Sequence, residues 1–311
     1  MNRQTPLIAA LLSSVFLIWT HGPPTAAVAQ TRDYDAYQTN GGLREIVPGH
    51  YVFTRKATVT FNSGIIVTDD GVVVLEPLLD DEVATQVRRA VAEVTDQPVR
   101  FLISSSFHEF YSGGAGAYAE AHNIGHEAYR RHLLDALAGQ PGDVVRRRLP
   151  DQTYRDRITL HVGGKEIQIL HLGRGHTRGD SVVFVPEDRI VYMSELYNHR
   201  EFPSLTDSYS GDWVDALGRA DALEADIFVP GHGLITENPT DSRAGMRRFR
   251  QLLVDLRHAV QAEVVAGATE EEAVARVSLP GYGSDTGYDR GLEGAVRRIY
   301  TELTVGLDGT R

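Results

Sequence analysis

The chain has 311 residues, of which 42% are hydrophobic and 23% are charged, and its formal net charge is −11. This length and composition are typical of a globular protein with one or two domains. Nucleic acids and anionic membrane surfaces bind basic patches, so the acidic balance excludes both as main partners. We expect a small-molecule substrate or ligand instead, and the sequence gives no indication of the oligomeric state.

Residues 1–29 have the pattern of a signal peptide. Arg3 supplies the positive start, Leu7–Trp19 is an apolar stretch, and Ala27-Val28-Ala29 is a small-x-small cleavage site. The apolar stretch is shorter than the roughly 18 residues that a spanning helix needs, which favours cleavage over an uncleaved membrane anchor. We therefore expect a periplasmic or secreted protein with no stable membrane span after cleavage, a linker over 30–42, and one domain over 43–311.

The sequence contains no cysteine. Disulfides and thiolate ligands are therefore excluded, although the expected compartment is an oxidising one. Any metal ion must be held by histidine, carboxylate, tyrosine or hydroxyl oxygen.

Short apolar runs separated by turns predict strands in the first part of the chain. The predicted strands are Tyr51–Thr54, Thr58–Phe61, Gly64–Thr68, Val72–Leu75 and Val99–Ile103. The last of these is apolar except for Arg100, which is typical of a central strand. Before it, residues 81–95 carry their apolar side chains on one face, which predicts a helix.

The later part of the chain follows the same order of strands and then helices. Hairpins are predicted over 158–170 and 182–193, a short strand over 227–229, and helices over 126–138, 212–223, 241–266 and 289–303. Ser210 or Asp212 is expected to cap the helix over 212–223. Two sheets packed together with helices outside them, within one domain, would satisfy this order.

Three segments place polar side chains directly or shortly after predicted strands. They are Ser104–Gly114, Leu172–Asp180 and Pro230–Gly233. Loops at strand ends converge on one edge of a layered fold, where binding and catalytic sites collect.

These segments resemble, in order and spacing, the motifs of the metallo-β-lactamase superfamily. The resemblance rests on Pro230-Gly231-His232-Gly233, on Gly175-His176-Thr177-Arg178-Gly179-Asp180, and on the Gly-Gly pair that closes the loop of His108. It covers about residues 45–235. It implies an α/β fold, the four-layer αβ/βα sandwich, with a metal site at one edge of the two sheets.

The family's usual two-metal loop is altered in this sequence, and only His108 of its ligands is retained. Ser106 stands where the family has the first histidine, Phe110 where it has the aspartate of the second metal, and Tyr111 where it has that metal's histidine. Hydroxyl oxygen is a poorer ligand than imidazole, and a phenyl ring offers no donor atom. The departures therefore predict at most one metal ion, without the second.

The remaining ligands implied by the resemblance are His176 and His232, with Glu195 in place of the bridging aspartate. Together with His108 they would form a set of three histidines and one carboxylate, which suits Zn²⁺, Fe²⁺ or Mn²⁺. Glu76 also stands where an aspartate is usual. His199 is a further candidate as a ligand or proton shuttle.

The preferred hypothesis is a metal-dependent hydrolase that acts on an ester, lactone or amide. Glu195 would bind the ion or take a proton from the attacking water, and Tyr111 would stabilise the oxyanion. For Tyr111, packing and a hydrogen bond are the alternative role. Glu109 is expected to be a surface charge, and Asp180 is expected to brace a neighbouring loop.

Two other classes of function remain open. One is a non-catalytic periplasmic binding protein that keeps the fold, supported by the residues at 106 and 110. The other is an iron-dependent oxidative enzyme in which Tyr111 is a phenolate ligand. Arg174 and Arg178, which flank His176, are either solvated or bind a substrate carboxylate.

Overall fold

The computed structural model of the protein describes residues 41–307. The predicted signal peptide and nearly all of the predicted linker lie outside these residues. Within them, no helix is long and apolar enough to cross a membrane.

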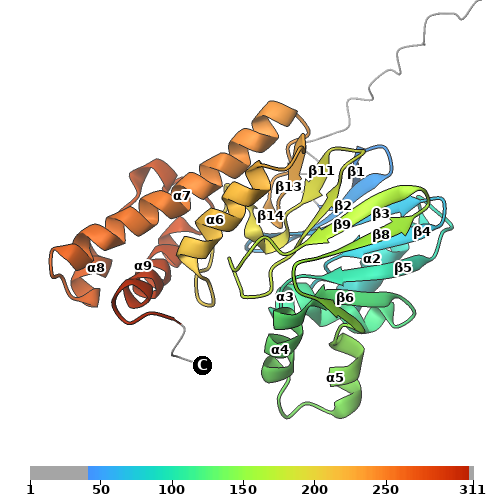
Figure 1. Cartoon of the computed structure of the whole chain (residues 1–311), viewed down its shortest axis with the longest axis horizontal. Helices are drawn as coiled ribbons and strands as arrows, with labels where there is room; N and C mark the ends of the chain where they lie inside the picture. The colour runs from blue at the N-terminus through green and yellow to red at the C-terminus, as the bar shows by residue number, and fades with distance from the viewer. Residues whose placement is uncertain (1–40, 308–311) are drawn as a thin grey trace, which may run out of the picture. The chain divides into compact units, whose positions relative to one another are not determined.

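The first sheet has seven strands, which lie side by side in chain order. They are β1 (Gly42–Val47), β2 (His50–Lys56), β3 (Thr60–Thr68), β4 (Gly71–Leu75), β5 (Val99–Ser104), β6 (His122–His126) and β7 (Gln152–Tyr154). The neighbours from β1 to β4 are antiparallel, and those from β4 to β7 are parallel. Parallel neighbours need crossover connections, and helices provide them here. These are α2 (Asp81–Ala92), α3 (Glu109–Ser112), the 3₁₀ segment η1 (Gly113–Tyr118), α4 (Glu127–Ala136) and α5 (Gly142–Arg148) (Figure 1).

The second sheet has five strands in the order β13-β11-β10-β9-β8. They are β8 (Arg157–Val162), β9 (Lys165–Leu170), β10 (Val182–Val185), β11 (Ile190–Tyr192) and β13 (Ile227–Val229). All its pairs are antiparallel except that of β11 with β13, and α6 (Ser210–Asp221) lies in the connection between those two. A short parallel pair, β12 (Asn198–His199) with β14 (His232–Gly233), brings the chain after β11 beside the chain after β13.

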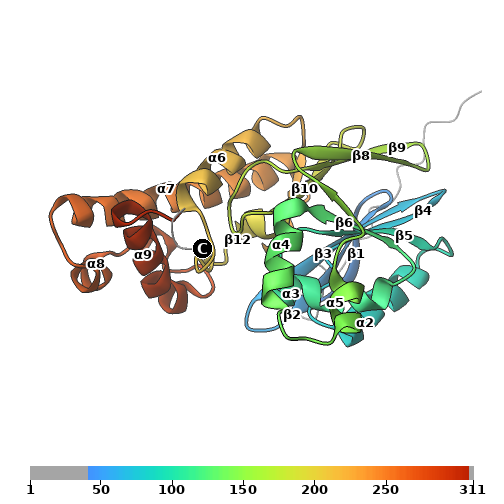
Figure 2. The same ribbon diagram turned by 60° about the horizontal axis from the view of Figure 1, so that its bottom comes forward.

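Three apolar cores separate four layers, as expected for an αβ/βα sandwich. The middle core lies between the sheets, where Val52 and Ile66 of the first meet Ile167 and Val183 of the second. A second core joins the first sheet to α2. The third joins the second sheet to α6, α7 (Pro239–Val265), α8 (Glu270–Arg276) and α9 (Tyr288–Thr304), with η3 (Pro280–Tyr282) between the last two (Figure 2).

The structure corrects the sequence prediction at two elements. Residues 58–61 and 64–68 were expected as separate strands, but β3 runs without a break from Thr60 to Thr68 and leaves residues 58 and 59 outside it, because the polar side chains at 62 and 63 are hydrogen-bonded. Asn62 donates to the carbonyls of Pro230 and Gly233 at 3.0 Å each, and Ser63 donates to a carbonyl of β4.

The predicted side-chain cap of α6 is also wrong. The helix begins after Tyr209, and the distant Glu302 carboxylate caps it by accepting from the N–H groups of Ser210 at 3.0 Å and Gly211 at 3.3 Å, while the hydroxyl of Ser210 donates to the same carboxylate at 2.6 Å. The strands β1, β6 and β7 and the helices α5 and α8 were not predicted.

A stacked pair of histidines at the start of α4 makes the folding stability of the protein sensitive to acid. The rings of His126 and His171 lie 4.0 Å apart, and burial together with the His171 ring lowers the pKa of His126 to about 4. The folded state therefore binds fewer protons than the unfolded state below about pH 6.5, so its stability falls as the pH drops from there toward 4.

We expect His126→Asn to remove part of this acid sensitivity. His126 is the N-cap of α4 and accepts from the Ala128 N–H at 3.1 Å, a role that asparagine also fills. Urea unfolding at pH 5 and pH 7.5 measures the effect. The loss of unfolding free energy between the two pH values should be smaller in the variant, and an equal loss in both proteins would contradict the assignment.

Candidate metal centre

Four polar side chains meet at the edge where strands of both sheets end. They come from the segments that follow four different strands. His108 follows β5, His176 lies between β9 and β10, Glu195 lies in the 3₁₀ segment η2 (Ser194–Leu196) after β11, and His232 follows β13. The predicted convergence of strand-end loops is therefore what places these groups together.

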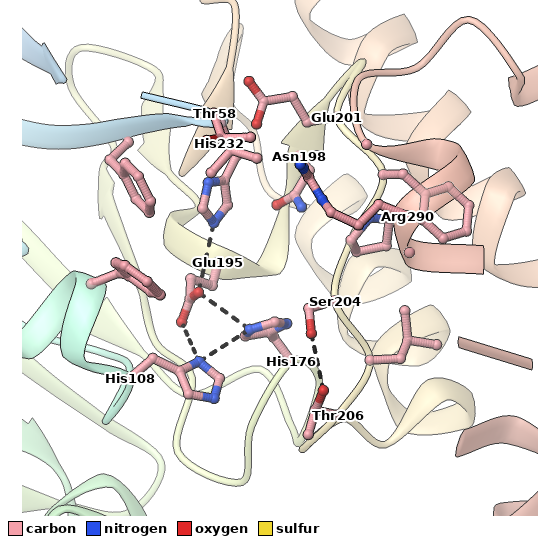
Figure 3. Close-up of a pocket in the computed structure, with 18 of the residues that line it drawn as sticks. Thr58, His108, His176, Glu195, Asn198, Glu201, Ser204, Thr206, His232 and Arg290 are labelled. Carbon is pink, nitrogen blue, oxygen red and sulfur yellow. Dashed lines mark hydrogen bonds and ion pairs between the residues drawn. The ribbon is translucent and has the colours of Figure 1, made fainter. Parts of the chain in front are cut away.

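The carboxylate of Glu195 is the common contact of the three imidazoles (Figure 3). Its Oε2 lies 3.2 Å from Nδ1 of His108, and its Oε1 lies 3.2 Å from Nε2 of His176. The two imidazole nitrogens are themselves 3.2 Å apart. Nε2 of His232 is slightly further away, at 3.6 Å from Oε1.

This spacing fits a single small cation. Metal–ligand bonds of about 2.0 to 2.1 Å in a tetrahedral site put neighbouring ligand atoms about 3.3 Å apart. The ligand atoms of His108, His176 and Glu195 all lie within 4.8 Å of one another. The donor set of imidazoles and a carboxylate is one that Zn²⁺, Fe²⁺ and Mn²⁺ accept. His232 supplies a fourth donor at the margin of the group.

The electrostatics of the cluster call for a positive charge beside the carboxylate. Burial alone would raise the pKa of Glu195, but His176 and His108 hold it well below its usual range. Burial likewise opposes protonation of His108, but Glu195 and Asp207 outweigh it and raise its pKa to about 10. A buried carboxylate is stable only with such a partner, which either a proton or a metal cation supplies.

Two of the three histidines are oriented by a hydrogen bond from the ring nitrogen that faces away from the cluster. Nδ1 of His232 lies 2.7 Å from the carbonyl oxygen of Thr60, and Nε2 of His108 lies 3.0 Å from Oδ2 of Asp207. Such bonds fix the tautomer that leaves the other nitrogen free to bind a cation. Nδ1 of His176 is buried with no hydrogen-bond partner among the described residues, and its ring packs edge-on against Trp213.

Asp207 was not found by reading the sequence. It lies in the segment between β12 and α6, 99 residues after the histidine that it contacts. No strand end or motif marks its position, so only the folded structure brings it to the site.

The three altered positions of the metal loop add little to the cluster. Ser106 is buried, and its hydroxyl lies 3.2 Å from Nδ1 of His108. Phe110 is 56% exposed and stacks on Phe61, with the ring centroids 5.4 Å apart. Tyr111 is fully buried, and its hydroxyl donates to the carbonyl of Gly231 at 2.5 Å.

Tyr111 therefore has the packing and hydrogen bond that were its alternative role. It does not line the cavity described below, and burial is the main reason that its pKa lies well above the usual range. A role in oxyanion stabilisation would require the hydroxyl to leave the Gly231 carbonyl, and it stays a prediction.

The other candidate residues lie around the cluster rather than in it. Nδ1 of His199 lies 2.7 Å from the hydroxyl of Tyr197, away from the cluster. Asp180 accepts from both the backbone and the hydroxyl of Thr177, so it braces the loop of His176 as expected. Glu76 is buried beneath the site.

Glu76 bonds to two serines that adjoin the site loops. Its Oε1 accepts from Ser105 at 2.5 Å and from Ser194 at 2.7 Å. Burial, as the largest effect, raises the pKa of Glu76 to about 8.

Glu109 pairs with Arg148 at 2.7 Å on the surface.

The two arginines beside His176 are both engaged. Arg174 pairs with Asp212 at 2.5 Å, and Arg178 donates to the hydroxyl of Tyr209. Neither lines the cavity.

The cluster opens into a cavity of about 710 Å³. One wall comes from the first sheet and α3, with Val59, Phe61 and Phe110, and the opposite wall comes from the segment 201–207 and from α9. The apolar groups are Ala57, Val59, Phe61, Leu79, Phe110, Phe202, Pro203, Leu205 and Ala295. The arrangement can therefore hold a largely apolar molecule against the donor cluster.

Comparison with known proteins identifies the family. The model of the metallo-beta-lactamase superfamily matches residues 61–232, which include all four residues of the cluster. The chain belongs to the metallo-β-lactamase superfamily. The superfamily includes hydrolases. Membership in it confirms the predicted fold class.

Relatives of several activities are similar to the chain at low identity. A linear primary-alkylsulfatase of Pseudomonas sp. is 22% identical over 79% of this chain and 54% of its own length. A type 2 metallo-beta-lactamase of Bacteroides fragilis is 23% identical over 56% of this chain and 70% of its own. The chain thus spans about half the length of the alkylsulfatase.

Solved structures agree on the fold. A metallo-beta-lactamase from Pontibacter korlensis superposes with a TM-score of 0.59 at 20% identity, covering 68% of this chain and 98% of its own. A stereoselective inverting sec-alkylsulfatase from Pseudomonas sp. gives a TM-score of 0.69 at 16% identity, covering 87% of this chain and 51% of its own.

We expect Tyr111→Phe to lower the stability and leave metal binding unchanged. The substitution removes a buried hydrogen bond while the Gly231 carbonyl keeps its bond from the Asn62 N–H at 2.9 Å, so the cost should be about 1 kcal/mol. Denaturant unfolding and elemental analysis measure the two quantities. Loss of bound metal with unchanged stability would show that Tyr111 is a ligand instead.

Proposed function

We propose that the chain is a metal-dependent hydrolase with a single ion, acting on an ester, lactone or amide. The convergence of Nδ1 of His108 and Nε2 of His176 with the carboxylate of Glu195, all at 3.2 Å, carries the proposal. His232 completes the set as a fourth, more distant donor. We also propose that the protein works in the periplasm or outside the cell and acquires its ion after export.

We propose that no second metal binds, because two of its usual ligands are replaced. The positions at 110 and 111 hold a phenyl ring that stacks on Phe61 and a hydroxyl that is bonded to a backbone carbonyl. The four donors that remain suit zinc, iron or manganese, and the family favours zinc.

The bound ion would polarise the scissile carbonyl and lower the pKa of a water molecule beside it. Glu195 balances the positive charge and holds the imidazoles in their present directions. Asp207 acts as a positioning residue, because its bond to Nε2 of His108 keeps Nδ1 directed at the cluster. We propose that Glu195 also accepts the proton of the attacking water, since it is the carboxylate at the centre of the group.

The cavity walls would bind the substrate and exclude water. Phe61 and Phe110 form an apolar surface beside His108 and His232, and Phe202 and Leu205 face it from the other wall. An acyl or alkyl group placed there would bring its ester or amide carbonyl to the donor cluster. Water exclusion strengthens the electrostatic contacts inside such a site.

We expect the purified protein to carry about one equivalent of metal per chain. Because His176 supplies a central ligand atom, His176→Ala should reduce the metal content to near zero and abolish ester hydrolysis while the fold is kept. Elemental analysis, together with circular dichroism, makes the measurement.

His199→Gln is the matched control, since this histidine lies outside the cluster. It should retain the metal and the activity. Well-folded wild-type protein that binds no added Zn²⁺, Fe²⁺ or Mn²⁺ would contradict the proposal, and so would unchanged metal content in His176→Ala.

The cavity wall offers a test of substrate placement. A Cβ added at Gly294 of α9 would meet nothing within 4 Å, so Gly294→Leu can fill part of the cavity without strain. We expect kcat/KM for bulky aryl esters to fall by about tenfold or more, with a small effect on acetates. Gly294→Ala is the control. An equal change for large and small esters would contradict substrate binding along α9.

A further inference from the structure

The wall that α9 contributes to the cavity consists of small residues and one cation. Gly287, Gly291, Gly294 and Ala295 line the cavity together with Arg290. The guanidinium lies along the start of the helix, since a Cβ at Gly287 would come within 3.1 Å of its Nη2. Figure 3 shows the Arg290 side chain extending from α9 toward Asn198.

Arg290 is the one lysine or arginine among the described residues that line the cavity. It has no hydrogen bond or ion pair with another described residue, although four acidic residues line the same cavity. Those acids are engaged elsewhere, namely Glu195 with the histidines, Asp207 with His108, Glu109 with Arg148, and Glu201 with the N–H of Thr60.

The start of α9 adds further positive potential at the same place. The N-cap residue of this 17-residue helix is Gly287, which has no side chain, and no side-chain cap bonds the first turn. Backbone N–H groups of an uncapped first turn attract anions. Asp289 also lies in this turn; like Arg290 it is exposed, but unlike Arg290 it does not line the cavity.

A buried amide beside Arg290 is also incompletely bonded. Asn198 is 6% exposed and lines the cavity, and its Oδ1 is buried without a hydrogen-bond partner among the described residues. Oδ1 only accepts, so a water molecule or another donor must complete its bonding, whereas the Nδ2–H2 group of the same amide can donate to an oxyanion. The guanidinium, the helix start and the amide thus form one polar patch in an otherwise apolar wall.

We propose that this patch, which we call the Arg290 site, binds an anionic group of the substrate. Building on the proposed function, the substrate is then an amphiphile. Its hydrolysable bond lies at the His–Glu cluster, its apolar body lies between the walls, and an oxyanion such as a carboxylate or a sulfonate-like group lies at Arg290. The planar guanidinium can bind such groups through two parallel hydrogen bonds.

Binding of naphthalene probes tests the proposal without any reaction. Naphthalene-1-acetate and naphthalene-1-sulfonate carry different anions, and naphthalene-1-acetamide is a neutral molecule of similar shape. Equilibrium dissociation constants are measured by fluorescence with the full chain, both with Zn²⁺ added and after treatment with chelator.

We expect both forms of the wild-type protein to bind at least one anionic probe about tenfold or more tightly than the amide, and the stronger anion identifies the preferred group. Arg290→Ala should remove this preference while leaving the affinity for the amide within about twofold. Arg290→Lys keeps the positive charge but lacks the planar guanidinium with its paired N–H donors, so it should retain part of the preference for anionic probes.

Arg89→Ala is the matched control, since it removes the same charge from the exposed end of α2, which does not line the cavity. It should bind all three probes as the wild type does. Equal affinities for anionic and neutral probes in the wild type, or an unchanged anion preference in Arg290→Ala, would overturn the proposal. Because the chelated protein is included, anion binding can succeed where metal binding fails, so the two proposals fail separately.

Discussion

Three imidazoles from three separate loops meet on the carboxylate of Glu195, which is buried at the edge of both sheets. A carboxylate at this depth is costly unless opposite charge and hydrogen-bond donors surround it, so the loops must fold together for any of them to be stable. The same demand for positive charge makes the cluster a candidate metal centre. The cavity, the Asp207 contact and the Arg290 site are all arranged around this group.

Hydrogen bonds among buried residues next to the cluster hold its loops in place. Glu76 bonds Ser105 and Ser194, which adjoin the loops of His108 and Glu195, and Tyr111 bonds Gly231 next to His232. At two positions where the resemblance places ligands of a second metal, Tyr111 bonds a backbone carbonyl and Phe110 stacks on Phe61.

The sequence predicted the fold, which is confirmed, and it named the four side chains that the structure brings together, since strand ends and short motifs mark His108, His176, Glu195 and His232; their role as metal ligands stays a prediction. It did not identify the residues that contact the cluster or line the cavity from segments without a motif. Asp207 lies in an irregular loop, and Arg290 lies on a C-terminal helix that is placed beside the site by packing against α7 and α8. The continuous strand β3 was missed for a related reason, since Asn62 and Ser63 look exposed until their distant partners are known.

Anomalous X-ray diffraction from crystals of the protein, collected above and below the absorption edge of the metal that it carries, tests the account most directly. We predict one peak, within bonding distance of Nδ1 of His108, Nε2 of His176 and the carboxylate of Glu195, and no peak near Phe110 and Tyr111. A second metal beside those two residues, or a cluster that stays free of metal in crystals soaked with Zn²⁺, would contradict it.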